Sequence, residues 1–177
     1  RSVSPCKSPI AACGSSAWCL AICTLHNRVL GAFPRAAQQQ VFGSRPDAVV
    51  CGVFMPGGTA TPVEGGYRLT GRWDFASSCD HADHAILAGL IQAEPGAPPS
   101  GLVNCLVRRA DFAIEDNWFV AGLQGTGSKR VVVDDVFVPA DHLIGEEGKG
   151  WDINRSVMGV TRAPVGAIAL GIARRAY

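Results

Sequence analysis

Residues 65–87, GGYRLTGRWDFASSCDHADHAIL, decide how the chain folds. The first half is rich in β-branched and aromatic residues and begins at a Gly-Gly pair, so it predicts a β-strand that follows a turn. The final AIL begins another apolar run and predicts a second strand. Five residues of metal-binding type lie between the strands: Cys79, Asp80, His81, Asp83 and His84. The stretch therefore raises the question whether this polar cluster binds a metal.

Runs of the same kind lie on both sides of this stretch. Turn-forming clusters separate them, for example Pro56-Gly57-Gly58 and the proline-rich residues 94–100. Short strands at regular spacing are typical of an antiparallel sandwich or barrel, here of about ninety residues. The predicted strands are AVVCGVFM (48–55), YRLTGRWDFAS (67–77), AILAGLI (85–91), LVNCLVRR (102–109), FAIEDNWFV (112–120) and RVVVDDVFVP (130–139).

Helical patterns flank this β module. Apolar residues recur at helical spacing from Ala17 to Val29, a short helix is expected from Arg35 to Phe42, and helical spacing returns after the polar loop GEEGKGW (145–151). The order predicts an α+β fold. We expect a helical domain to end within residues 1–46, a β domain at 47–142 and the start of a helical bundle at 143–177. The chain begins without Met and stops within a helical pattern, so we expect a fragment.

Composition limits the classes of function. Of 177 residues, 47% are apolar and 18% charged, and the net charge is +1, which argues against disorder and against binding to nucleic acid or a membrane surface. We find no apolar run of the ~18 residues that a spanning helix needs. Seven cysteines without a Cys-x-x-Cys motif are expected to be mostly buried thiols in a reducing compartment, so we expect a cytoplasmic protein.

Three motifs suggest ligands, and each has a simpler explanation. Cys19, Cys23 and His26 fall on one helical face but lack an obvious fourth zinc ligand. The cluster 79–84 enters a strand, whose alternation sends its side chains to opposite faces, so we expect no metal at either place. GLQGTGSKR (122–130) has neither the P-loop order nor the third glycine of a dinucleotide fingerprint. It remains a glycine-rich turn suited to a hairpin or to a ligand lying close.

These motifs together carry a resemblance to a known family. GGYRLTGRWDFASSCDHADHAIL followed by GLQGTGSKRVVVDDVFVPADH resembles the acyl-CoA dehydrogenase superfamily. Within it, the chain is most similar to the flavin-dependent two-component aromatic monooxygenases, such as the 4-hydroxyphenylacetate and steroid-phenol hydroxylases. CGSSAW, LHNRVLGAFPRAAQQQVFG and TRAPVGAIALGIARRAY extend the match from Cys13 to the end, whereas residues 1–12 do not fit. The resemblance implies a helical domain, a central β domain and a C-terminal four-helix bundle, assembled as a homotetramer.

The resemblance also implies roles for particular residues. Phe75 and Ala76 would lie along the flavin ring, with the Phe75 side chain against the isoalloxazine. The Ser77 hydroxyl, which can donate and accept a hydrogen bond, would reach flavin N5. Arg162 would bind the flavin phosphates of a neighbouring subunit through its forked donors. His26 would lie at an aromatic substrate and accept a phenol proton.

Three positions depart from the family pattern. Gly52 stands where relatives often carry a serine that helps to hold a phenolic substrate. His84 replaces a frequent Trp, and Gln124 replaces a frequent Arg. The identity of the substrate therefore stays open.

The activity implied is that of the oxygenase component of a two-component monooxygenase. Reduced flavin (FMN or FAD), supplied by a separate NAD(P)H-dependent reductase, would react with O2, and the flavin C4a-hydroperoxide would transfer one oxygen atom to a small aromatic or heteroaromatic substrate. The alternative is an acyl-CoA dehydrogenase acting on a thioester, but the FASSCDHAD motif of this sequence differs from the WITNG motif usual in such dehydrogenases. A third possibility is a non-catalytic fragment.

Overall fold

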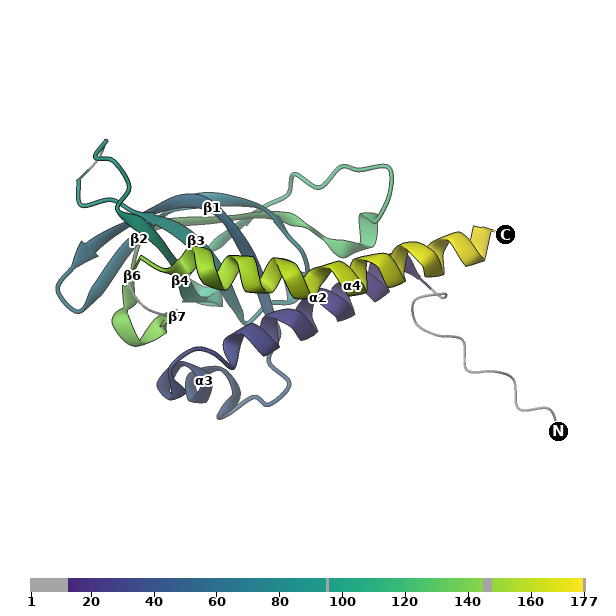
Figure 1. Ribbon diagram of the computed structural model, residues 1–177, viewed down its shortest axis with the longest axis horizontal. Coiled ribbons are helices and arrows are strands. Elements are labelled where there is room, and N and C mark those ends of the chain that lie inside the picture. The colour runs from purple at the N-terminus through teal and green to yellow at the C-terminus, as the bar shows by residue number, and fades with distance from the viewer. Residues whose placement is uncertain (1–12, 95, 145–147, 177) are drawn as a thin grey trace.

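The computed structural model describes residues 13–94, 96–144 and 148–176 (Figure 1). Residues 1–12, with Cys6, and part of the predicted loop 145–151 lie outside these ranges. The two helices expected before residue 46 are confirmed, although the first begins three residues earlier than expected. The helices and strands in chain order are α2 (Gly14–Leu30), α3 (Arg35–Phe42), β1 (Val50–Val63), β2 (Gly66–Ala76), β3 (His84–Ile91), β4 (Gly101–Arg108), β5 (Ala113–Glu115), β6 (Lys129–Pro139), β7 (Leu143–Ile144) and α4 (Gly150–Ala176).

The strands form one seven-stranded sheet in the order β5-β6-β2-β1-β3-β4-β7. The predicted α+β class is therefore confirmed, but the expectation of a wholly antiparallel sheet is wrong at one pair, because β1 and β3 are parallel. The cause is the connection: β2 folds back on β1 as a hairpin, and the chain then crosses to the opposite edge of β1, where β3 runs in the direction of β1.

Strand β1 continues through Pro56-Gly57-Gly58, where the sequence predicted a turn. The register against β3 shifts between Val53 and Gly58, so these residues form an irregularity within the strand. A side chain at Gly57 would come within 2.7 Å of the Trp73 indole. The glycines are there because Trp73 of the neighbouring strand packs against the bare backbone.

The predicted strand 112–120 is only three residues long, from Ala113 to Glu115. The rest of that run is an exposed loop in which the Phe119 side chain is 85% accessible. Trp118 of this loop packs edge-to-face on Phe75, with ring centroids 6.0 Å apart. Aromatic content therefore predicted a strand where the residues in fact form a surface loop.

Each face of the sheet buries its own core. Strand β3 shows the division, because Ile86 packs toward the helices while Ala85 and Leu87 belong to the core on the other face. Such a strand reads as a continuous apolar run because both of its faces are covered. The helix-side core also contains Leu30 of α2 and Val157 of α4.

Helices α2 and α4 pack against each other, and α2 also contacts β1 while α4 contacts β4 (Figure 1). Much of α4 is exposed, including Met158 and Leu170 at 58% and 56% accessibility. By length and composition alone α4 could cross a membrane, since an 18-residue window has a mean hydropathy of 1.4 and is only 17% buried. The expectation of no apolar run long enough to span a membrane is therefore wrong for α4, in which Ala and Gly residues separate the larger apolar ones.

Candidate functional site

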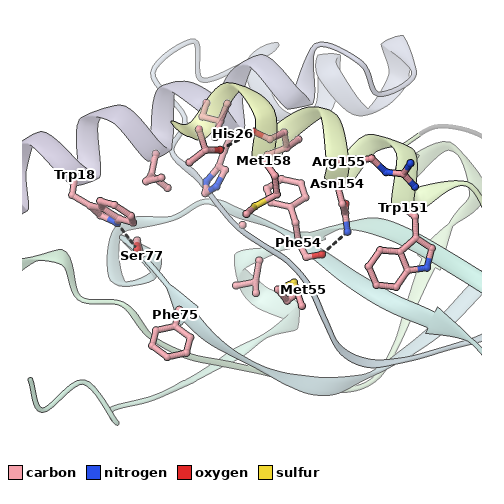
Figure 2. A pocket seen from close by; sticks show the side chains of 16 residues that line it. Trp18, His26, Phe54, Met55, Phe75, Ser77, Trp151, Asn154, Arg155 and Met158 are labelled. Atoms are coloured by element: carbon pink, nitrogen blue, oxygen red, sulfur yellow. Dashed lines mark hydrogen bonds between the residues drawn. The ribbon is translucent and has the colours of Figure 1, made fainter. Parts of the chain in front are cut away.

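A cavity of about 420 Å³ opens between α2, α4, the middle of β1 and the end of β2 (Figure 2). Its wall is mostly apolar, and a few polar side chains from different elements face it, as in typical small-molecule sites. The lining residues are Trp18, Ile22, Leu25, His26, Gly52, Val53, Phe54, Met55, Phe75, Ser77, Trp151, Asn154, Arg155, Val157, Met158 and Thr161.

His26 projects from α2 toward this cavity and is 3% exposed (Figure 2). Its Nδ1 lies 3.1 Å from the Val50 carbonyl oxygen, which can only accept, so Nδ1 carries the hydrogen. The lone pair is therefore on Nε2, beside Gly52, where an added Cβ would lie 3.3 Å from Nε2. Burial lowers the pKa of His26 to about 4, so the imidazole is neutral at neutral pH and presents an acceptor.

Ser77 is buried, and its hydroxyl belongs to a chain of hydrogen bonds. The Trp18 indole N–H donates to Ser77 Oγ at 2.9 Å, as Figure 2 shows. Ser77 Oγ lies 2.7 Å from Ser128 Oγ, and Ser128 Oγ lies 2.7 Å from Thr126 Oγ1. Thr126 Oγ1 donates to the Leu123 carbonyl oxygen at 2.9 Å. The glycine-rich turn 122–130 thus supports the hydroxyl that faces the cavity.

Phe75 and Ala76 point in different directions although they are neighbours in β2. Ala76 is fully buried in the sheet core, while the Phe75 side chain is 71% exposed. Phe75 has a φ of 65° and Ser78 a φ of 67°, in the left-handed region that residues with a Cβ rarely adopt. Such strain persists where the surrounding structure enforces it, and it is concentrated at functional sites.

The polar cluster 79–84 is engaged in local structure. Asp83 accepts a hydrogen bond from the Val49 N–H at 2.9 Å and pairs with Arg45, and Asp80 lies 3.1 Å from Lys129 Nζ. The Cys79 thiol lies 3.6 Å from the Gly127 carbonyl oxygen. Within residues 13–94, 96–144 and 148–176, no three His, Cys, Asp or Glu side chains gather as metal ligands would. The carboxylates order the entry to β3.

The structure brings three of the predicted site residues, His26, Phe75 and Ser77, to one cavity. Arg162 is exposed on α4 and does not line it. Asn154, which was not predicted from the sequence, also faces the cavity, where its amide N–H donates to the Phe54 carbonyl oxygen.

Three side chains that bond Ser77 directly or indirectly were not predicted from the sequence. Trp18, Thr126 and Ser128 lie 59, 49 and 51 positions from it, so spacing alone could not group them. The visible signal was that CGSSAW and GTGS both took part in the family resemblance.

Comparison with known proteins identifies relatives by sequence. No family model matches the chain. A FADH(2)-dependent resorcinol hydroxylase, oxygenase component, from Rhizobium sp. (strain MTP-10005) is 42% identical over 136 residues, 76% of this chain and 32% of that protein. The flavin-dependent monooxygenase oxygenase subunit HsaA of Rhodococcus jostii (strain RHA1) is 41% identical over 133 residues, 75% of this chain and 34% of that protein. The chain thus spans about a third of the length of these curated relatives.

Solved structures share the fold. XiaF from Streptomyces sp., solved in complex with FADH2 and glycerol, matches with a TM-score of 0.85 and 31% identity over 94% of this chain and 45% of that one. Butyryl-CoA dehydrogenase from Megasphaera elsdenii matches with a TM-score of 0.81 and 22% identity over 94% of this chain and 48% of that one. The second likeness concerns the fold alone.

Proposed function

We propose that this chain, a homologue of the oxygenase components of flavin-dependent monooxygenases with the acyl-CoA dehydrogenase-like fold, forms the flavin- and substrate-facing part of such an oxygenase. The whole protein would use reduced flavin and O2 to hydroxylate a small aromatic or heteroaromatic substrate. The observation that carries the proposal is the apolar cavity in which His26, Phe75 and Ser77 meet, in a chain that is 42% identical over 136 residues to a resorcinol hydroxylase component.

The residues present fit a bound flavin. An exposed aromatic ring held in a left-handed conformation offers a flat apolar surface, and Phe75 has both properties. The Ser77 hydroxyl lines the same cavity and would meet a ring nitrogen, and buried Ala76 lies between the two residues in the strand. When bound, reduced flavin (FMN or FAD) supplies the activation of O2. The chain's own contribution is to orient the ring and exclude water with its apolar wall.

His26 would bind the substrate hydroxyl. Its Nε2 is a neutral acceptor in an apolar wall, and it faces the space that Gly52 leaves free. When a phenol donates its hydroxyl hydrogen to Nε2, the electron density of the phenol ring increases. This increase favours reaction of the ring with an electrophilic oxygen. A serine is absent at Gly52, so His26 alone would hold the hydroxyl on this side. The low pKa of His26 opposes full proton transfer before the reaction begins.

The remaining assignments rest on exposed features of α4. Arg162 is exposed there and would reach the flavin phosphates of a neighbouring subunit. The exposed apolar side chains of α4 would be covered in a homotetramer through a helical bundle. We also propose the division into residues 1–46, 47–142 and 143–177, a separate NAD(P)H-dependent flavin reductase as partner, and a cytoplasmic location.

The test is product formation by the full-length protein with photoreduced flavin, ¹⁸O2 and a panel of simple phenols. We expect a product heavier by one ¹⁸O atom, and we expect its yield to fall in His26→Ala and Ser77→Ala. The exposed His81→Ala is the matched control. If no phenol gains oxygen, and acyl-CoA thioesters instead bleach the oxidised flavin, the protein is a dehydrogenase and the proposal is wrong.

A further inference from the structure

The hydroxyl chain behind the cavity has a preferred direction. Thr126 Oγ1 has one hydrogen, and the Leu123 carbonyl oxygen at 2.9 Å can only accept it. Thr126 then accepts from Ser128, Ser128 accepts from Ser77, and Ser77 accepts from the Trp18 N–H. In this arrangement every hydroxyl hydrogen has an acceptor. In the reverse arrangement the Ser77 hydrogen would point into the cavity with no protein partner, and Leu123 would lose one donor.

We propose that Ser128 and Thr126 orient the Ser77 hydroxyl as a hydrogen-bond acceptor toward the cavity, so that the site selects a ligand with a ring N–H over one with a bare ring nitrogen. This inference rests on the proposed function, in which that ligand is a flavin. Reduced flavin carries a hydrogen on N5, whereas oxidised flavin has only a lone pair there. This chain of hydrogen-bonded hydroxyls therefore favours binding of reduced flavin, the form that the oxygenase would receive from its reductase.

Neither Ser128 nor Thr126 lines the cavity, and both are buried, at 5% and 2% exposure. They are positioning residues that act through Ser77. The Leu123 carbonyl also accepts from the Thr126 backbone N–H at 3.1 Å and from the Trp118 indole at 3.3 Å. The acceptor at the end of the chain is thus held by the same loop that packs on Phe75, and removing one hydroxyl does not leave this carbonyl without donors.

The test is the ratio of two dissociation constants, that of oxidised flavin divided by that of reduced flavin. Both are measured anaerobically in the full-length protein by titration with FMN and with FAD. In Thr126→Val, Ser128 loses its acceptor and can donate to Ser77, whose hydrogen then turns to the cavity. In Ser128→Ala, the Ser77 hydrogen is freed directly. We expect the ratio to fall about threefold to tenfold in both, since one neutral hydrogen bond is involved. A tenfold fall corresponds to a shift of about −30 mV in the bound flavin's two-electron potential.

Two further variants separate orientation from packing. Thr126→Ser keeps the hydroxyl and should restore the ratio of the unaltered protein. Trp18→Phe removes a donor to Ser77 but leaves the Ser77 hydrogen on Ser128, so the preference for reduced flavin should survive even if both affinities fall. An unchanged ratio in Thr126→Val and Ser128→Ala, with melting curves that show folded proteins, would overturn the inference alone. If the unaltered protein binds neither flavin form, the proposed function fails and the inference falls with it.

Discussion

Two aromatic residues of strand β2, Trp73 and Phe75, lie two positions apart and have opposite surroundings. Strand alternation would place both on the same face. Trp73 is 1% exposed, packs on the glycines of β1 and donates to the Ala88 carbonyl oxygen at 2.8 Å. Phe75 is 71% exposed in a left-handed conformation, after the register against β6 shifts between Trp73 and Ala76. The same strand thus contributes Trp73 to the closed core and Phe75 to the open site.

The difference shows how a sheet supplies a site without losing its core. Trp73 is buried, its indole N–H is hydrogen-bonded and its ring packs on the glycines of β1, so this region provides stability. Around Phe75 the backbone is strained and a large apolar surface is left uncovered, which is unfavourable until a ligand lies on it. Four predictions test this contrast.

The largest effect is expected for Trp73→Ala. Deleting a fully buried indole should lower the free energy of unfolding by ~3–5 kcal/mol, because the cavity left behind cannot collapse around it. Phe75→Ala should change it by less than ~1 kcal/mol, as at other exposed positions. Urea unfolding followed by circular dichroism measures both. Equal losses would mean that the two aromatics do not differ as described.

The cavity beside Phe75 is also lined by His26, a buried titratable group that should make the free energy of unfolding depend on pH. The pKa of His26 is lowered from 6.5 to about 4 in the folded protein. Between these values the unfolded chain binds a proton that the folded chain does not, so the free energy of unfolding should fall as pH drops from about 6.5 to 4. The full loss is ~3 kcal/mol for a shift of this size. His26→Gln should make this dependence shallower, leaving the part that comes from His84, whose pKa burial also lowers, whereas the exposed control His81→Gln should leave the dependence unchanged.

The closed region should reject even a small addition. Gly57→Ala would put a Cβ 2.7 Å from Trp73 Cδ1 and against the Arg72 backbone. We expect a loss of ~1–3 kcal/mol from overpacking. Gly159→Ala on α4 is the matched control, since nothing lies within 4 Å of the added methyl and helix propensity favours alanine. A tolerated Gly57→Ala would show that Trp73 is loosely packed.

The smallest effect, with the opposite sign, is expected for Phe75→Gly. Glycine adopts a φ of 65° without strain, so the free energy of unfolding should rise by up to ~1 kcal/mol after the entropy that glycine gains in the unfolded chain is subtracted. The same variant should bind flavin more weakly, because the aromatic surface is lost. A stability loss close to that of Trp73→Ala would place Phe75 in the core instead.

The sequence predicted the elements better than their arrangement. Periodicity identified α2, α3 and most strands, because apolar residues must recur on the buried face of each. The glycines of β1 were interpreted as a turn, since nothing local shows that Trp73, fifteen or more residues later, occupies the space they leave. The parallel pairing of β1 with β3 is likewise a property of the connection and not of either strand.

The site was predictable only in part, and through the family resemblance. The sequence motifs shared with the family predicted His26, Phe75 and Ser77 as site residues, and these residues meet at one cavity. The motifs did not predict Thr126 or Ser128, because the hydrogen bonds that join them to Ser77 exist only after β2 and the turn before β6 come together. Side chains that act through another residue leave no local pattern.

The placement of the tryptophans makes the protein its own optical probe. Of the four in the sequence, Trp18 and Trp151 line the cavity and Trp118 packs on Phe75, while Trp73 alone is sealed in the core. Iodide should therefore quench most of the emission and leave a blue-shifted remainder from Trp73. A ligand that fills the cavity should shield Trp18 and Trp151 from iodide, so the accessible fraction of the fluorescence would report occupancy without any label.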